Sequence, residues 1–134
     1  MSKTIPEAAY RVLDDVNFAH VVTLLPDGMP QTTPVWIDRQ DGVPIFNTAK
    51  GRVKHANLVR DPRVAFSVHD HTNPYVYLQV RGHAEIVDDP DKASIEALSQ
   101  KYMGGPYPFH REGEERVIVR VIPSDVVWLD PNAQ

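Results

Sequence analysis

The stretch of the chain with the strongest chemical character runs from Phe46 to Asn57 and reads FNTAKGRVKHAN. A strand end, a glycine turn and a helix start in this order leave backbone amides free, and the helix dipole adds positive potential there. Thr48 can donate a hydroxyl, Arg52 can engage two anionic oxygens through its planar guanidinium, and Lys54 adds a point charge. The segment therefore predicts a phosphate site, and a solvated basic helix is the alternative explanation of the same spacing.

Other familiar sites are missing from the sequence. It holds no G-x-x-x-x-G-K-[ST] loop, no G-x-G-x-x-G, no G-x-S-x-G and no H-E-x-x-H, so no self-contained hydrolase or nucleoside triphosphatase is expected. It has no cysteine, which excludes disulfides, thiolate metal sites and cysteine nucleophiles. His69 and His71 have the spacing to share a metal, but no further ligand follows at metal-site spacing. We expect exposed turn histidines and no metal.

The composition is that of an ordinary globular chain. Of its 134 residues 42% are hydrophobic and 24% charged, and no linker divides it, so we expect a single domain over residues 1–134. The N-terminus lacks the apolar core of a signal peptide and no run is long enough to span a membrane, which favours a cytoplasmic protein. The net charge of −4 argues against a nucleic-acid-binding surface. Basic residues still gather locally at Lys50, Arg52, Lys54, Arg60 and Arg63.

Short elements must position these residues. In the first half, Thr4 and Glu7 have the spacing of a helix capping box. β-Branched runs on either side of the 26–28 turn predict a β-hairpin, and Pro34 assigns its second strand to an edge, bulge or break because proline cannot donate to a sheet ladder. The elements expected here are a helix to about Asp15, strands over 20–25, 30–38 and 43–48, and a basic helix over 52–60.

The second half predicts more short strands and one helix. The run over 75–80 is apolar on both faces, which predicts a barrel wall that also meets another subunit. The expected elements are strands over 63–69, 75–80 and 83–87, a helix from Asp89-Pro90 to Gly104 with Ile95, Leu98 and Tyr102 on one face, and strands over 117–121 and 126–128. Six or seven strands joined by tight turns predict a mainly β fold, an antiparallel barrel rather than a parallel sheet.

Three segments carry a resemblance to a known family. They are GMPQTTPVWID, FNTAKGRVKHANLVRDPRVAFSVHD and YVYLQVRGHAEIV. In this order they resemble the pyridoxamine 5′-phosphate oxidase-like superfamily, and most of all its branch that uses the deazaflavin coenzyme F-420. The resemblance covers roughly residues 15 to 128. It implies an FMN-binding type of split barrel that forms a homodimer with a cofactor cleft at each subunit boundary.

The resemblance also implies roles for individual positions. Thr48, Arg52 and Lys54 would hold the cofactor phosphate, with Asn47 and Lys50 beside them and Asn57 bracing the loop. The residues that would line the ring system are Gln31, Thr33, Pro34, Val35 and Trp36, with Tyr77 and Gln79 facing the cofactor from the other subunit. The chain departs from the classical oxidases, because it has no arginine between Gln31 and Ile37 and no arginine-rich C-terminal segment. Oxidation of pyridoxamine phosphate is therefore not expected, and the extra charge of Lys50 favours a deazaflavin with an anionic tail over FMN.

The function implied is hydride transfer between reduced coenzyme F-420 and a small electron-poor substrate such as an enone, quinone or tetrapyrrole. The cofactor carries the hydride, which explains why no catalytic triad is present. Solvent and Tyr77 are both open as the proton source. Alternatives of the same fold are an FMN-binding reductase or stress protein and a non-catalytic flavin or deazaflavin carrier. A barrel that stacks single-stranded nucleic acid on Trp36, Tyr75 and Tyr77 is a further alternative, which the acidic net charge disfavours.

Overall fold

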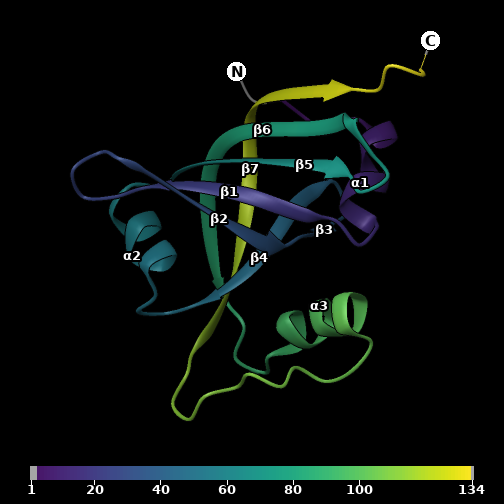
Figure 1. Cartoon of the computed structure of the whole chain (residues 1–134). Helices are drawn as coiled ribbons and strands as arrows, with labels where there is room; N and C mark the ends of the chain where they lie inside the picture. The colour runs from purple at the N-terminus through teal and green to yellow at the C-terminus, as the bar shows by residue number, and fades with distance from the viewer. Residues whose placement is uncertain (1–2, 134) are drawn as a thin grey trace.

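One antiparallel sheet of seven strands curls around a buried core in the computed structural model, which describes residues 3–133 (Figure 1). The strands are β1 (Phe18–Leu24), β2 (Pro30–Trp36), β3 (Asp38–Gln40), β4 (Val43–Ala49), β5 (Arg63–Asp70), β6 (Asn73–Asp88) and β7 (Arg116–Leu129). They hydrogen-bond in the order β2-β1-β5-β6-β7-β4-β3, so the sheet curls until β2 approaches β4 without pairing with it. The predicted mainly β, antiparallel fold is confirmed.

The helices are short and lie outside the sheet. They are a 3₁₀ turn η1 (Glu7–Ala9), α1 (Tyr10–Asp14), α2 (Val53–Arg60) and α3 (Ala93–Met103). The capping box predicted at Thr4 and Glu7 is wrong, since no side chain caps this start and Pro6 is still extended at φ −65° and ψ 142°. A capping box needs the residues after its first member to be helical, and Pro6 interrupts them.

Strand β2 is an edge strand, one of the three outcomes (edge, bulge or break) that Pro34 allowed. Its only paired neighbour among residues 3–133 is β1, with His20 opposite Pro34 and Leu24 opposite Pro30. Two prolines in one strand are tolerated because an edge has a row of amide positions that need no ladder partner. Along β1 the side chains alternate, so that Ala19 and Val21 are buried while His20 is exposed on the outer face.

Strands β6 and β7 are longer than predicted because each passes through a bend. The sequence indicated a break at Gly82, but β6 runs on through it, and the register with β7 shifts between Arg81 and Gly82. A Cβ added at Gly82 would lie 1.9 Å from the backbone oxygen of Ile122, so only glycine lets the two backbones approach this closely. Pro123 is paired opposite Gly82 within the same bend.

Helix α3 lies at one end of the barrel, apart from α2 (Figure 1). The carboxylate of Asp89, just upstream of the helix, accepts hydrogen bonds from the backbone amides of Ser94 and Ile95. These bonds satisfy two amides of the first turn. Gly104 ends the helix in the left-handed region at φ +74°. No helix in the described part of the chain is long and apolar enough to cross a membrane.

Candidate functional site

A pocket of about 900 Å³ runs along the outer face of β2 and β1, between α2 on one side and α3 on the other. Its residues come from almost every part of the chain. They are Val16, Asn17, Phe18, His20, Pro34, Val35, Trp36, Asn47, Thr48, Arg52, Lys54, His69, His71, Ile95, Leu98, Tyr107, Phe109 and Arg116. We divide the lining into three sections. The cationic end holds Thr48, Arg52, Lys54 and Arg116, the aromatic section holds Trp36, Tyr107 and Phe109, and the histidine end holds His20, His69 and His71 with Asn17.

The cationic end is formed by Thr48, Arg52, Lys54 and Arg116. Arg52 and Arg116 both contact Glu114, at 3.0 and 3.2 Å. Burial raises the pKa of Glu114, but the hydrogen bonds and positive charge of the two arginines outweigh it, so the pKa is lowered overall. Glu114 is therefore a carboxylate that holds both guanidinium groups in position.

Lys54 differs from the two arginines because it has no carboxylate beside it among the described residues. Its ammonium donates a hydrogen bond to Thr33 Oγ1 at 3.0 Å. The pKa of Lys54 is lowered first by burial and then by the positive charge of Arg52. A half-buried cation that is held by a neutral hydroxyl and repelled by a neighbour is stabilised by an anionic ligand.

Asn57 supports this end from below. It is buried, and its Nδ2 donates to Thr23 Oγ1 at 3.0 Å and to Gln31 Oε1 at 3.5 Å. Arg60 donates in turn to Asn57 Oδ1 at 2.9 Å. These bonds fix the base of α2 against β1 and β2, and a role for Asn57 in bracing a cofactor loop stays a prediction.

Trp36 stands at the centre of the aromatic section. It stacks on Tyr102 at 5.3 Å with an interplanar angle of 13°, and the edge of Tyr107 meets it at 6.0 Å. Tyr102 is anchored by its hydroxyl, which accepts from the amide of Ile37 at 2.9 Å and donates to the carbonyl of Asn17. Burial raises the pKa of Tyr102 to about 12, so this hydroxyl keeps its proton at neutral pH.

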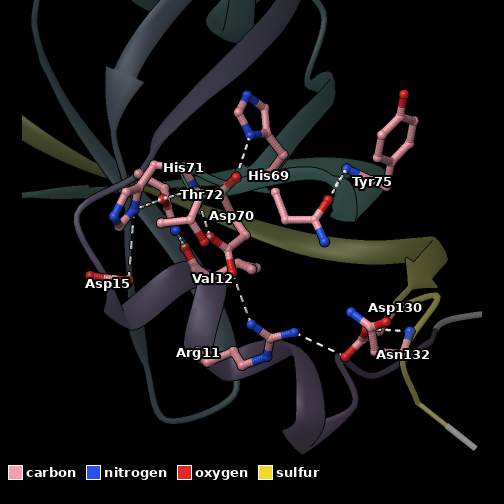
Figure 2. Close-up of polar contacts among 12 residues, drawn as sticks. Arg11, Val12, Asp15, His69, Asp70, His71, Thr72, Tyr75, Asp130 and Asn132 are labelled. Atoms are coloured by element: carbon pink, nitrogen blue, oxygen red, sulfur yellow. Dashed lines mark hydrogen bonds and ion pairs between the residues drawn. The ribbon is translucent and has the colours of Figure 1, made fainter.

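The histidine end lies where β5 turns into β6, and it is formed by His20, His69 and His71 with Asn17. Figure 2 shows the turn held by its own polar contacts: Arg11 reaches Asp70 at 3.1 Å and Asp130 at 3.0 Å. His71 contacts Asn17 Oδ1 through both its backbone amide and its Nδ1. Across residues 3–133, no group of three or more His, Cys, Asp or Glu side chains is placed to hold a metal ion.

The structure brings most of the predicted site residues to this pocket. Those that line it directly are Pro34, Val35, Trp36, Asn47, Thr48, Arg52 and Lys54. Thr33, Gln31 and Asn57 lie behind it and are joined to it by the hydrogen bonds given above. Lys50 points elsewhere and pairs with Asp88 at 3.2 Å.

Tyr77 and Gln79 also lie outside the pocket of the single chain. They lie on the same outer face of the sheet as the histidine end of the pocket, because Tyr77 pairs with His69 and Gln79 with Ser67 across β5 and β6. Their predicted contact with a cofactor from a second subunit stays a prediction.

Sequence reasoning missed Arg116 and the histidine end. Arg116 enters the site because Ala49 pairs with it across β4 and β7, and its Nε donates to Asn47 Oδ1 at 2.8 Å. Long-range strand pairing brings Arg116 and the histidines to the pocket, and no local motif marks it. Tyr107 was missed as well; it lies in the segment after α3, where its backbone amide donates to Glu96 Oε1 at 3.0 Å. The one indication in the sequence that Arg116 belongs to a strand was its position at the start of the alternating run that forms β7.

These residues fit a flat conjugated ring with an anionic tail. The unmatched ammonium of Lys54, beside the Thr48 hydroxyl and two guanidiniums, suits a phosphate. The wall of Pro34, Val35 and Trp36 suits the faces of a ring. The pocket is therefore compatible with FMN or a deazaflavin.

Comparisons with known proteins identify the family of the chain. The family model described as pyridoxamine 5′-phosphate oxidase matches residues 5–128. A solved F-420 reductase is 36% identical, with a TM-score of 0.81 over 92% of this chain and 98% of that one. The conserved hypothetical protein Rv2991 of Mycobacterium tuberculosis is 26% identical, with a TM-score of 0.72 over 91% of this chain and 82% of that one.

A more distant structure shows the fold alone. General Stress Protein 26 of Bacillus anthracis is 17% identical, with a TM-score of 0.71 over 93% of each chain. No curated protein sequence matched the chain. The match over residues 5–128 and the 36% identical structure agree with the curled seven-stranded sheet. The chain belongs to the pyridoxamine 5′-phosphate oxidase family and has its split-barrel fold.

Proposed function

We propose that the protein is an oxidoreductase that uses coenzyme F-420 to transfer a hydride to or from a small electron-poor organic molecule of the enone, quinone or tetrapyrrole type. Family membership and the 36% identical F-420 reductase support a flavin or deazaflavin oxidoreductase in general. The observation that carries the proposal is Lys54, a half-buried ammonium without a carboxylate partner in the described chain, at one end of a ring-sized pocket.

The protein's part in the reaction is to bind, orient and exclude water. A reduced flavin or deazaflavin supplies the hydride when bound. Thr48, Arg52 and Lys54 would hold its phosphate, and Arg116 adds a cation that is itself fixed by Asn47 and Glu114. Pro34, Val35 and Trp36 would support the ring, leaving the rest of the pocket for the substrate.

We further propose that two copies pair through the outer face of the sheet and close the pocket. This face carries large exposed apolar side chains, with Tyr75 72% and Phe18 52% exposed, and Leu129 opposite Tyr77. The pairing would bring Tyr77 and Gln79 of one copy toward the cofactor of the other. Light scattering on the purified protein should give the mass of a dimer, whereas a monomer that binds cofactor fully would contradict the pairing. A cytoplasmic location stays a prediction.

The cofactor is tested by titration. Coenzyme F-420 and FMN are added separately to dialysed protein while the cofactor fluorescence is followed. The proposal predicts one site per chain and tighter binding of coenzyme F-420. FMN remains the second candidate because the family model itself describes a pyridoxamine phosphate oxidase. Tight FMN binding with no response to the deazaflavin would reverse the preference.

Catalysis is tested separately from binding. Reduced cofactor is mixed with the protein and an acceptor such as a quinone, and the oxidation rate is compared with that of free cofactor. An oxidoreductase accelerates the transfer with at least one acceptor class. Tight binding that leaves every rate at its uncatalysed value would identify a cofactor carrier instead.

A further inference from the structure

The histidine end of the pocket lies across the sheet from the cationic end. The cationic end is beside edge strand β2, and the strands that follow are β1 and then β5. His20 on β1 pairs with Pro34 on one side and with Ser67 on the other, and His69 is two residues beyond Ser67 on the same face. Two strand spacings, about 10 Å, therefore separate the ring wall of β2 from His69.

His69 is oriented by the backbone of its own turn. Its Nδ1 lies 2.7 Å from the carbonyl oxygen of Asp70. A carbonyl only accepts, so Nδ1 carries a hydrogen and Nε2 is the nitrogen left for a ligand. Figure 2 shows Nε2 of His69 directed away from Asp70 and from the other labelled residues. The register shift between His69 and Asp70 is the kind of bulge that re-aims a side chain beside a site.

The turn that orients His69 is itself fixed. Asp70 accepts from the backbone amide and the hydroxyl of Thr72, both at 2.7 Å, and from Arg11 at 3.1 Å. The hydrogen bonds of Thr72 and then the charge of Arg11 lower the pKa of Asp70, so its carboxylate stays ionised and keeps these contacts. The orientation of the imidazole is thus built into the protein.

A conjugated carbonyl that accepts a hydride also needs a proton on its oxygen. Among the described residues that line the pocket, the proton-bearing groups at the cationic end are Thr48, Arg52, Lys54 and Arg116, which the phosphate would occupy. Imidazole is the side chain that exchanges a proton most readily near neutral pH. Tyr77, the side chain that the sequence offered for this role, does not line the pocket of its own chain.

We propose that His69 forms the substrate-oxygen subsite and donates the proton when an enone or quinone is reduced here, an inference that rests on the proposed function. The electron-poor carbon accepts a hydride with its two electrons from the reduced flavin or deazaflavin. As the new C–H bond forms, the C=C π pair moves into the bond between the α-carbon and the carbonyl carbon, and the C=O π pair moves onto the oxygen. The imidazolium Nε2–H of His69 gives that oxygen its proton, and the resulting enol tautomerises in water to the saturated ketone or, from a quinone, to the hydroquinone. Water returns a proton to the neutral imidazole, so the cofactor is oxidised and the substrate reduced by two electrons.

The subsite is tested first without cofactor. 4-Nitrophenolate mimics the oxyanion that forms on the substrate, and its binding is followed by absorbance and by the ¹⁵N shifts of the histidine rings. The proposal predicts that Nε2 of His69 shifts on binding and that His69→Gln weakens binding at least about tenfold. His83→Gln is the matched control, because His83 is exposed on β6 and does not line the pocket. An unchanged affinity in His69→Gln would overturn the subsite.

The proton transfer is tested in the loaded enzyme. His69→Gln should leave the dissociation constant of the cofactor unchanged and lower the rate of enone or quinone reduction about 100-fold, and His69→Gly should recover activity when imidazole is added. Full activity of His69→Gln would overturn the proton donor. If the wild-type protein binds neither FMN nor coenzyme F-420, the proposed function fails, while the nitrophenolate titration still decides the subsite.

Discussion

Lys54 Nζ donates a hydrogen bond to Thr33 Oγ1 across 3.0 Å, and this contact joins helix α2 to the edge strand β2 at the cationic end of the pocket. Two segments that are predicted separately, a hairpin strand and a basic helix, are thereby joined beside one pocket. The hydroxyl of Thr33 positions the ammonium without neutralising it. An anion that enters the pocket therefore meets a cation already directed toward it.

The pKa of Lys54 predicts how cofactor affinity depends on pH. Burial and the charge of Arg52 lower this pKa, so in the free protein Lys54 loses its proton below the range of an exposed lysine. A bound phosphate favours the ammonium, so binding takes up a proton and weakens as pH rises. Titrations between pH 7 and 10 should show this decline, and Lys54→Arg, which stays charged, should flatten it. A wild-type affinity that is constant to pH 10 would remove Lys54 from the site.

Lys50 distinguishes the two cofactors. It is exposed, pairs with Asp88 and does not line the pocket, so a ring and a single phosphate would not reach it. We expect that only an extended anionic tail outside the pocket reaches Lys50. Lys50→Met should weaken coenzyme F-420 binding a few-fold, the size of an exposed ion pair of about 0.2–1 kcal/mol, and leave FMN binding unchanged. Equal losses for both cofactors, measured by fluorescence titration, would assign Lys50 to the phosphate instead.

Tyr102 predicts a stability effect. In Tyr102→Phe the amide of Ile37 loses its acceptor while the ring stack on Trp36 remains. An unsatisfied buried donor costs about 1–3 kcal/mol, which urea unfolding followed by tryptophan fluorescence would measure. Tyr75→Phe is the control, since Tyr75 is 72% exposed. Equal stability of the two variants would mean that α3 is not anchored through this hydroxyl.

Gly82 predicts a larger effect. A methyl group at this position would overlap the backbone of Ile122, so β6 and β7 would have to separate at their shared bend. Gly82→Ala should lower the free energy of unfolding by about 3 kcal/mol. Both variants are measured by scanning calorimetry. Gly105→Ala, where a Cβ meets nothing within 4 Å, should leave the free energy of unfolding almost unchanged. A Gly82→Ala protein with wild-type stability would show that the close approach is not maintained in solution.

Local patterns predicted much of the fold. Pro34 restricted its strand to an edge, a bulge or a break, and the spacing after Gly51 predicted α2, because these features depend on a few neighbouring residues. The three-residue strand β3 was missed since Asp-Arg-Gln has no strand composition. β6 was divided in two because Gly82 has the same sequence signature in a bulge as in a break.

The site was predictable where its residues are adjacent in sequence. Thr48, Arg52 and Lys54 come from one strand-turn-helix segment, so their shared chemistry could be inferred before their positions were known. Arg116 and His69 reach the pocket through the pairing of β4 with β7 and of β1 with β5. Such pairings depend on tertiary packing, which the single sequence does not encode locally.

The central claim is that the cationic end binds the phosphate of the cofactor, and isothermal titration of Lys54→Met tests it most directly. Coenzyme F-420 should bind this variant about 1.5–3 kcal/mol more weakly than wild type, the range of a hydrogen bond to a charged group. Lys3→Met removes the same charge at an exposed position outside the pocket and should bind like wild type. Wild-type affinity in a folded Lys54→Met protein would contradict the account.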